Sequence, residues 1–270
     1  MNQIRSNILM MDVGGTSIKR YGLPAVPVKS QGTRSEIAAS LKSAVGDTSG
    51  LEGIGIAIPG PFDYRQGIFR ADHKFAAVKG LSFRELARLP EGTDVRFIHD
   101  VCAVLEGAIR MLGLTAENTA VVTLGTGLGL AVAERGAVRY GPTLSPADGI
   151  WNLPYGSGIL EDKVSGRGLR ALYEELGGEP TLTARDIAER AFHGDRDAIE
   201  AYERMGAILG EAICPLLEEH RVRNLLFGGQ ISQSLSLMED GLRRHLGGLI
   251  RISAAPEGAV YKGIETLFTI

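Results

Sequence analysis

The chain has 270 residues, of which 44% are hydrophobic and 23% charged, which is ordinary globular composition and excludes a disordered chain. The length exceeds a single typical hydrophobic core, so it predicts two domains. The formal net charge of −3, with no run of basic residues, argues against a nucleic-acid partner. Two widely separated cysteines and no apolar stretch of about 18 residues predict a cytoplasmic protein with free thiols and no membrane partner.

In the first half of the chain, strands alternate with helices. The spacings Thr33/Glu36 and Ser82/Glu85 predict capping boxes, which mark two helix starts. Pro59 ends a buried strand, because proline cannot donate to a sheet ladder. We expect strands at 8–11, 18–23, 25–28, 54–58 and 95–98, and helices at 34–46, after Ser82 and from Asp100.

The second half repeats the opening pattern of strand, Gly/Thr turn and strand, here at 120–124, 125–127 and 128–133. A stretch of low periodicity from 141 to 159 is long enough to predict a functional loop. We expect helices at 166–177, 183–193, 196–220, from Ser232 and at 259–267, and a strand at 224–227. The expected domains are 1–113, completed by a C-terminal helix at 257–270, and 114–256.

The first candidate site is the motif Asp12-Val13-Gly14-Gly15-Thr16-Ser17-Ile18-Lys19. Two glycines at a hairpin tip let backbone N–H groups converge on an anion, and Thr16 adds a hydroxyl donor. Asp12, at the strand end, can hold a hydrated Mg²⁺ beside that anion. An ordinary Gly-Gly hairpin turn is the alternative explanation.

Two further glycine motifs favour phosphate binding. Leu124-Gly125-Thr126-Gly127-Leu128-Gly129 places a second Gly/Thr turn in the other half, and two such turns can clamp a polyphosphate. Gly228-Gly229 follows a strand, where missing side chains would let a base or ribose approach the backbone. Each motif alone is also explained by a plain turn, and the duplication is what favours function.

His99-Asp100 lies where a strand meets a helix. Asp is a favoured N-cap, which explains Asp100 without any chemistry. A carboxylate at a helix N-terminus is also held ionised by the helix dipole, so it can accept the proton of a hydroxyl that attacks a phosphoryl group. The two roles are compatible.

These motifs occur in the order seen in the ROK family of repressors, open reading frames and sugar kinases, which the chain resembles over residues 8 to 267. The resemblance rests on the motif from Asp12, on Gly-Ile-Gly-Ile-Ala-Ile-Pro-Gly-Pro at 53–61, on Asp100, on the turn at 124–129 and on Phe-Gly-Gly-Gln-Ile-Ser at 227–232. It implies an α/β fold, the ribonuclease H-like fold of the actin, hexokinase and Hsp70 superfamily, duplicated into two domains with an interdomain cleft. It also implies a homodimer.

The resemblance also implies roles for individual residues. Asp100 matches the catalytic base, and Asp12 would lie at Mg²⁺, through water. Phosphate or nucleotide contacts are implied for Gly14, Gly15, Thr16, Lys19, Gly125, Thr126, Gly127, Gly228 and Gly229. Sugar contacts are implied for Pro59, Gly60, His99, Asp100, Asp148, Trp151 and Glu161, although Glu161 is equally explained as a solvated glutamate at a helix start.

Three positions depart from the family pattern: His99 replaces the usual Asn, Asp148 the usual Glu, and Trp151 a zinc-coupled His. The cysteine cluster is absent as well, so we expect no structural zinc. The phosphate motif begins at residue 12, so the helix-turn-helix extension of the family's repressors, and with it a DNA-binding role, is not expected. His220, in a polar helix end, is assigned no chemistry.

The leading hypothesis is a kinase that uses ATP and Mg²⁺ to phosphorylate a hydroxyl of a hexose or related sugar, with the 6-position expected. Two alternatives stay open: a glucokinase that uses inorganic polyphosphate, and a sugar-binding regulatory protein without turnover. The three departures predict that glucose is not the sole good substrate, because a changed set of hydrogen-bonding partners changes the preferred sugar.

Overall fold

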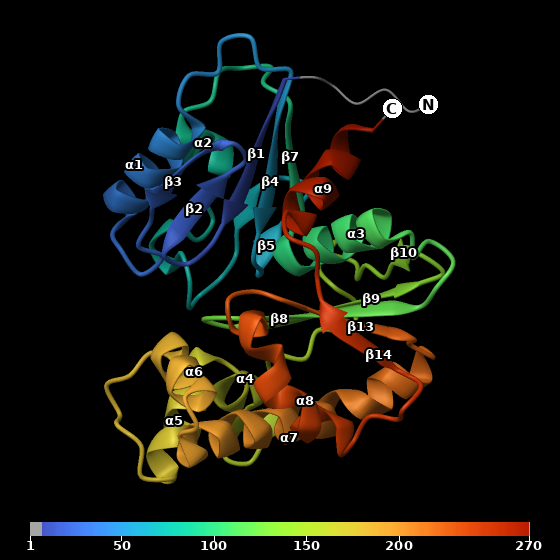
Figure 1. The fold of residues 1–270 in the computed structure, drawn as a ribbon. Helices are drawn as coiled ribbons and strands as arrows, with labels where there is room; N and C mark the ends of the chain where they lie inside the picture. Colours follow the sequence, from blue (N-terminus) through green and yellow to red (C-terminus); the bar gives the residue numbers. More distant parts are fainter. Residues whose placement is uncertain (1–6, 270) are drawn as a thin grey trace. The chain divides into compact units, whose positions relative to one another are not determined.

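The structure is a computed structural model that describes residues 7–269 (Figure 1). Contacts divide the chain into two units. Unit 1 comprises Met1–Gly113, Tyr140–Ala147 and Pro256–Ile270, and unit 2 comprises Leu114–Arg139 and Asp148–Ala255. The segment Tyr140–Ala147, which the sequence placed in the second domain, packs instead with unit 1.

Unit 1 is built on a five-stranded sheet of order β3-β2-β1-β4-β7. The strands β1, β4 and β7 are parallel neighbours, while β1, β2 and β3 form antiparallel hairpins. The strands are β1 (Ile8–Val13), β2 (Ser17–Arg20), β3 (Leu23–Pro27), β4 (Gly53–Ile58), β7 (Val95–His99) and the separate pair β5 (Phe62–Asp63) and β6 (Ile68–Phe69). The helices are α1 (Arg34–Val45), α2 (Phe83–Ala87), α3 (Asp100–Leu112) and α9 (Ala259–Glu265), with 3-10 turns η1 (Ala76–Val78) and η3 (Thr266–Phe268).

Strand β4 shows how the sheet of unit 1 is covered on both faces. Ile54, Ile56 and Ile58 point into a core shared with α1 and α2. On the other face, a Cβ at Gly55 would collide with Ile264 of α9, so glycine there lets that helix approach the sheet. A Cβ at Gly107 of α3 would likewise collide with α9. The C-terminal helix is therefore part of the core packing of unit 1.

Unit 2 repeats the plan with a sheet of order β10-β9-β8-β13-β14. Here β8 and β9 form the antiparallel hairpin, and β8, β13 and β14 run parallel. The strands are β8 (Thr119–Leu124), β9 (Leu128–Glu134), β10 (Ala137–Val138), β13 (Asn224–Gly228), β14 (Arg251–Ala254) and the pair β11 (Pro154–Tyr155) and β12 (Gly158–Ile159). The helices are α4 (Leu160–Lys163), α5 (Gly166–Glu175), α6 (Ala184–Phe192), α7 (Arg196–Glu219) and α8 (Leu235–Arg243), with a 3-10 turn η2 (Ile231–Ser234).

The expected strand–turn–strand repeat is confirmed, as are the two expected capping boxes that begin α1 and α2. A further capping box, formed by Thr183 and Asp186, begins α6. Three features differ from expectation. The helix expected from Ser232 begins at Leu235, after a 3-10 turn. Strand β14 was not expected, because Arg251–Ala254 is a short, largely exposed edge strand with little hydrophobic pattern. The expected loop at 141–159 contains the short pair β11 and β12.

Candidate active site

The first glycine turn joins β1 to β2 in unit 1. The Gly14 N–H donates to the Ser17 carbonyl over 2.9 Å, and the Gly15 carbonyl accepts from the Ser30 N–H over 3.0 Å. A Cβ at Gly14 would lie 3.1 Å from the Ser17 carbonyl oxygen, so the turn is closed too tightly for a side chain there. The turn is thus a tight hairpin tip in which the Gly14 N–H is used internally.

Asp12, at the end of β1, has a carboxylate whose pKa is raised by its surroundings. Its partner across the hairpin is Lys19, with the ammonium 4.0 Å from the carboxylate. Burial, and then the negative charge of Asp100, raise the pKa of Asp12 to about 6 despite Lys19. The main cause is the loss of solvation on burial, which a bound cation would offset.

His99 and Asp100 lie at the start of α3, but their roles are divided differently from the sequence interpretation. The N-cap position is held by His99, and Asp100 is the first helical residue. Asp100 Oδ1 accepts from the Val101 N–H at 2.7 Å and lies 2.8 Å from His99 Nδ1. Burial alone would raise the pKa of Asp100, but His99 and this N–H lower it overall, so the carboxylate stays ionised.

The Pro59-Gly60 turn lies beside this helix start. A Cβ at Gly60 would lie 3.4 Å from His99 Nε2 and 3.5 Å from the hydroxyl of Tyr64. Tyr64 is buried, donates to the Ile58 carbonyl over 3.0 Å, and stacks its ring 5.7 Å from that of His99. The sequence analysis missed Tyr64, because a tyrosine next to a hairpin carries no local sign of burial.

The second glycine turn joins β8 to β9 in unit 2. The Gly125 N–H donates to the Gly127 carbonyl over 3.1 Å, and the Gly125 carbonyl accepts from the Gly166 N–H at the start of α5 over 2.9 Å. No atom outside its chain neighbours lies within 4 Å of a Cβ placed on Gly125, so this side of the turn is open. Thr126, at its tip, is exposed.

Gly228-Gly229 lies directly against this turn. Gly228 is in register with Thr123, at the end of the neighbouring strand. Gly229 has a φ of +86°, and a Cβ there would collide with the Leu124 carbonyl. A side chain is therefore excluded by both conformation and space. The structure brings the second and third glycine motifs together, as phosphate and nucleotide contacts would need.

Glu161 contacts protein where the sequence suggested a sugar ligand. Its Oε2 accepts from the Leu128 N–H at 3.0 Å, just after the Gly125–Gly127 turn, and its Oε1 lies 3.4 Å from the Arg167 guanidinium. Its side chain is only 14% exposed. Glu161 therefore holds the turn in place. Trp151 contacts Glu161 through the backbone, because its carbonyl accepts from the Glu161 N–H over 3.1 Å. Trp151 is 37% exposed.

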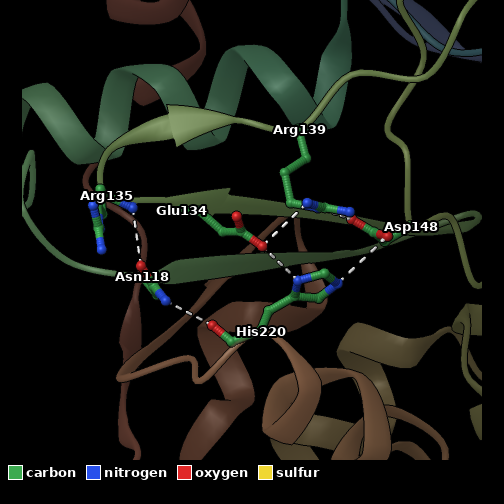
Figure 2. A network of polar contacts seen from close by, with 6 residues as sticks. All are labelled: Asn118, Glu134, Arg135, Arg139, Asp148 and His220. Carbon is green, nitrogen blue, oxygen red and sulfur yellow. Dashed lines mark hydrogen bonds and ion pairs between the residues drawn. The ribbon is translucent and has the colours of Figure 1, made fainter.

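Asp148 is engaged on both carboxylate oxygens (Figure 2). Its Oδ2 accepts from Arg139 Nε at 3.0 Å, and its Oδ1 lies 3.6 Å from Nε2 of His220. His220 is buried, with Nδ1 2.8 Å from Glu134 Oε1. His220 does cap the end of α7, as a histidine at a helix end can, but its burial between two carboxylates was not anticipated. Nothing in the local sequence signals these partners.

Two negative findings concern the described residues 7–269. No group of three or more His, Cys, Asp or Glu residues among them could hold a metal ion. No helix in this range is long and apolar enough to cross a membrane.

Comparison with known proteins identifies the relatives of this chain. The model of the ROK family matches residues 27–253. A glucokinase of Halalkalibacterium halodurans is 23% identical over 281 aligned positions, covering 87% of this chain and 83% of the relative.

Two solved structures share the fold. A ROK family glucokinase from Streptomyces griseus, in complex with glucose and AMPPNP, superposes with a TM-score of 0.80 at 20% identity, covering 97% of this chain and 99% of that one. A putative N-acetylmannosamine kinase from Listeria monocytogenes superposes with a TM-score of 0.79 at 17% identity, covering 97% and 98%. The expected α/β fold of two duplicated halves is thereby confirmed.

Proposed function

The chain belongs to the ROK family, and on that premise we propose that it is a kinase that transfers the γ-phosphoryl group of ATP to a hydroxyl of a hexose or related sugar. The 6-hydroxyl is the expected acceptor. The observation that carries the proposal is the carboxylate pair of unit 1. Asp12 lies beside a bare glycine turn and needs a cation, while Asp100 is kept ionised at a helix N-terminus.

Asp100 is the proposed base. As the sugar oxygen forms its bond to the γ-phosphorus, the bond from that phosphorus to the bridging oxygen of ADP breaks, and the hydroxyl proton passes to Asp100. A lowered pKa makes Asp100 a weak base. That suffices, because the hydroxyl gives up its proton late in a loose phosphoryl-transfer transition state. ADP is the leaving group.

Asp12 is the proposed partner of Mg²⁺, through water, because its raised pKa reflects chiefly the loss of solvation on burial, which a bound cation would offset. When bound, Mg²⁺ neutralises the charge of the phosphates. Nucleotide and phosphate contacts are proposed for the two turns and the Gly228-Gly229 strand end: Gly14, Gly15, Thr16, Lys19, Gly125, Thr126, Gly127, Gly228 and Gly229.

The proposed sugar contacts are Pro59, Gly60, His99 and Trp151. Tyr64 joins them, because it packs against Gly60 and His99. Asp100, the proposed base, would also contact the sugar. The carboxylates of Glu161 and Asp148, two other expected sugar ligands, have protein partners outside the Pro59-Gly60 turn. We therefore propose Glu161 as the residue that positions the phosphate turn.

The test is steady-state release of ADP with ATP, Mg²⁺ and a panel of glucose, mannose, allose, fructose, N-acetylglucosamine and N-acetylmannosamine. Turnover with at least one sugar, lost in Asp100→Asn, supports the proposal. Turnover with polyphosphate but not with ATP would show that polyphosphate, and not ATP, is the phosphoryl donor. Sugar binding by calorimetry without any turnover would overturn the kinase and favour a regulatory protein.

A further inference from the structure

The network around Asp148 lies at a particular place in the chain's path. The chain leaves unit 2 after Arg139 and returns to it at Asp148, so these two residues flank the segment Tyr140–Ala147 that packs in unit 1. Their side chains meet in an ion pair with Nε 3.0 Å from Oδ2. The two ends of the excursion are thus joined by a contact within unit 2. We call Tyr140–Ala147 the strap.

The ion pair is embedded in the rest of unit 2 (Figure 2). Arg139 also donates to Glu134 Oε1 over 3.1 Å, and Glu134 in turn pairs with His220 at the end of α7. Asn118 donates to the His220 carbonyl over 2.7 Å, which fixes the backbone of that histidine. The contacts therefore tie the β9–β10 hairpin and the returning chain to the end of α7.

Burial raises the free-energy cost of breaking these contacts. The side chains of His220 and Asp148 are only 6% and 15% exposed. A shielded carboxylate that loses its partner is left with an unpaired charge, which is far more costly than breaking an exposed ion pair. The Asp148 carboxylate has Arg139 at one oxygen and His220 at the other, so each oxygen faces a protein partner.

The strap itself packs within unit 1, which also holds the Pro59-Gly60 turn, Tyr64 and His99. It closes on itself, with the Gly141 N–H donating to the Ser145 carbonyl over 2.8 Å, and Leu144 packs against the unit 1 core. That core includes Tyr64, whose ring lies 5.7 Å from the ring of His99. The position of the strap therefore bears on Tyr64 and, through it, on His99.

We propose that Arg139, Asp148, Glu134 and His220 form a clasp that closes the base of the strap, and that Asp148 is a positioning residue for the sugar site instead of a sugar ligand. The clasp fixes where the strap begins and ends. The strap then holds Tyr64 against the Pro59-Gly60 turn. The part of this proposal that concerns sugar rests on the proposed kinase function.

A double-mutant cycle separates a clasp residue from a ligand. Arg139→Ala, Asp148→Ala and the double variant are compared with Arg185→Ala, which removes an exposed ion pair with Glu189 on α6 as a control. Melting temperature is measured without ligands, and KM is measured for sugar and for ATP. Arg139→Lys, which keeps the charge but loses the planar fork, serves if an alanine variant fails to fold.

If the clasp exists, both single variants melt lower than the control, and the double variant melts no lower than the worse single. Both single variants have a raised sugar KM, and the two KM values lie within about threefold of each other. The sugar KM of the double variant exceeds that of the worse single variant by less than about threefold, because the effects of coupled residues are not additive. ATP KM is unchanged. Arg139→Lys falls between wild type and Arg139→Ala.

Additive melting effects would overturn the clasp, whatever the enzyme's substrate. A large rise in sugar KM for Asp148→Ala alone, with Arg139→Ala like wild type, would make Asp148 a direct sugar ligand and refute the proposal. If wild type turned over no sugar, the kinase function would fail. The melting temperatures would then decide the clasp by themselves.

Discussion

Asp12→Asn should stabilise the metal-free protein while abolishing turnover. The native protein holds the Asp12 proton more tightly than the unfolded chain, because its pKa rises from 3.8 to about 6 on folding, chiefly through burial and then through Asp100. Ionised Asp12 therefore costs stability. The cost is absent below the unfolded pKa, grows as the pH rises from 3.8 to about 6, and is complete above that.

The size of the effect follows from the shift. About two pKa units at 1.36 kcal/mol each give a cost of about 3 kcal/mol at pH 8, and roughly half of that at pH 5. The Asp12 side chain is 23% exposed, so these figures are upper bounds. Asparagine keeps the shape and removes the charge. At roughly 2–4 °C per kcal/mol, the melting temperature of the variant at pH 8 should exceed that of wild type by at most about 6–12 °C.

The assay is thermal unfolding in EDTA at pH 5 and pH 8. Asp47→Asn is the matched control, since this exposed carboxylate of unit 1 accepts from the Ser49 N–H and its hydrogen bonds with Ser49 lower its pKa. The control should gain nothing at either pH. If Asp12→Asn melted no higher than wild type at pH 8, or gained equally at both pH values, the reasoning about Asp12 would be wrong.

Three further predictions concern catalysis, metal and substrate. Asp100→Asn keeps a side-chain oxygen that can accept from the Val101 N–H, so the melting temperature should not change. The kcat should fall by roughly 10² to 10⁴, because the proton acceptor is lost. A kcat near that of wild type would show that Asp100 is not the base. Elemental analysis should find less than one zinc per chain, and EDTA should abolish ADP release without lowering the melting temperature; stoichiometric zinc would contradict this. Across the sugar panel, another hexose or an N-acetylated hexose should reach a kcat/KM comparable to that of glucose. The reason is that His99 and Trp151 offer different hydrogen-bonding groups from the Asn and His of the family pattern. An overwhelming preference for glucose would refute this prediction. A homodimer is the expected state in solution, to be measured by light scattering.

The sequence by itself determined the features that depend on neighbouring residues. Capping boxes such as Thr33/Glu36 act over three positions, so the residue types alone predict the start of α1. The two Gly/Thr hairpins follow equally from a strand, a bare turn and a second strand. The same local patterns, in their order along the chain, gave the family resemblance and the candidate phosphate contacts.

The tertiary structure decided which polar groups meet. His220 and Glu134 are 86 positions apart, and Glu161 reaches Leu128 across 33 positions, so no local pattern could pair them. His99 occupies the N-cap position of α3 because the helix begins at Asp100, one residue earlier than the preference for aspartate at the N-cap suggests. Asp148 likewise lies 3.0 Å from Arg139, a partner that the family pattern did not imply. A buried charge takes whichever partner the packing brings within hydrogen-bond distance, and packing is a property of the whole chain.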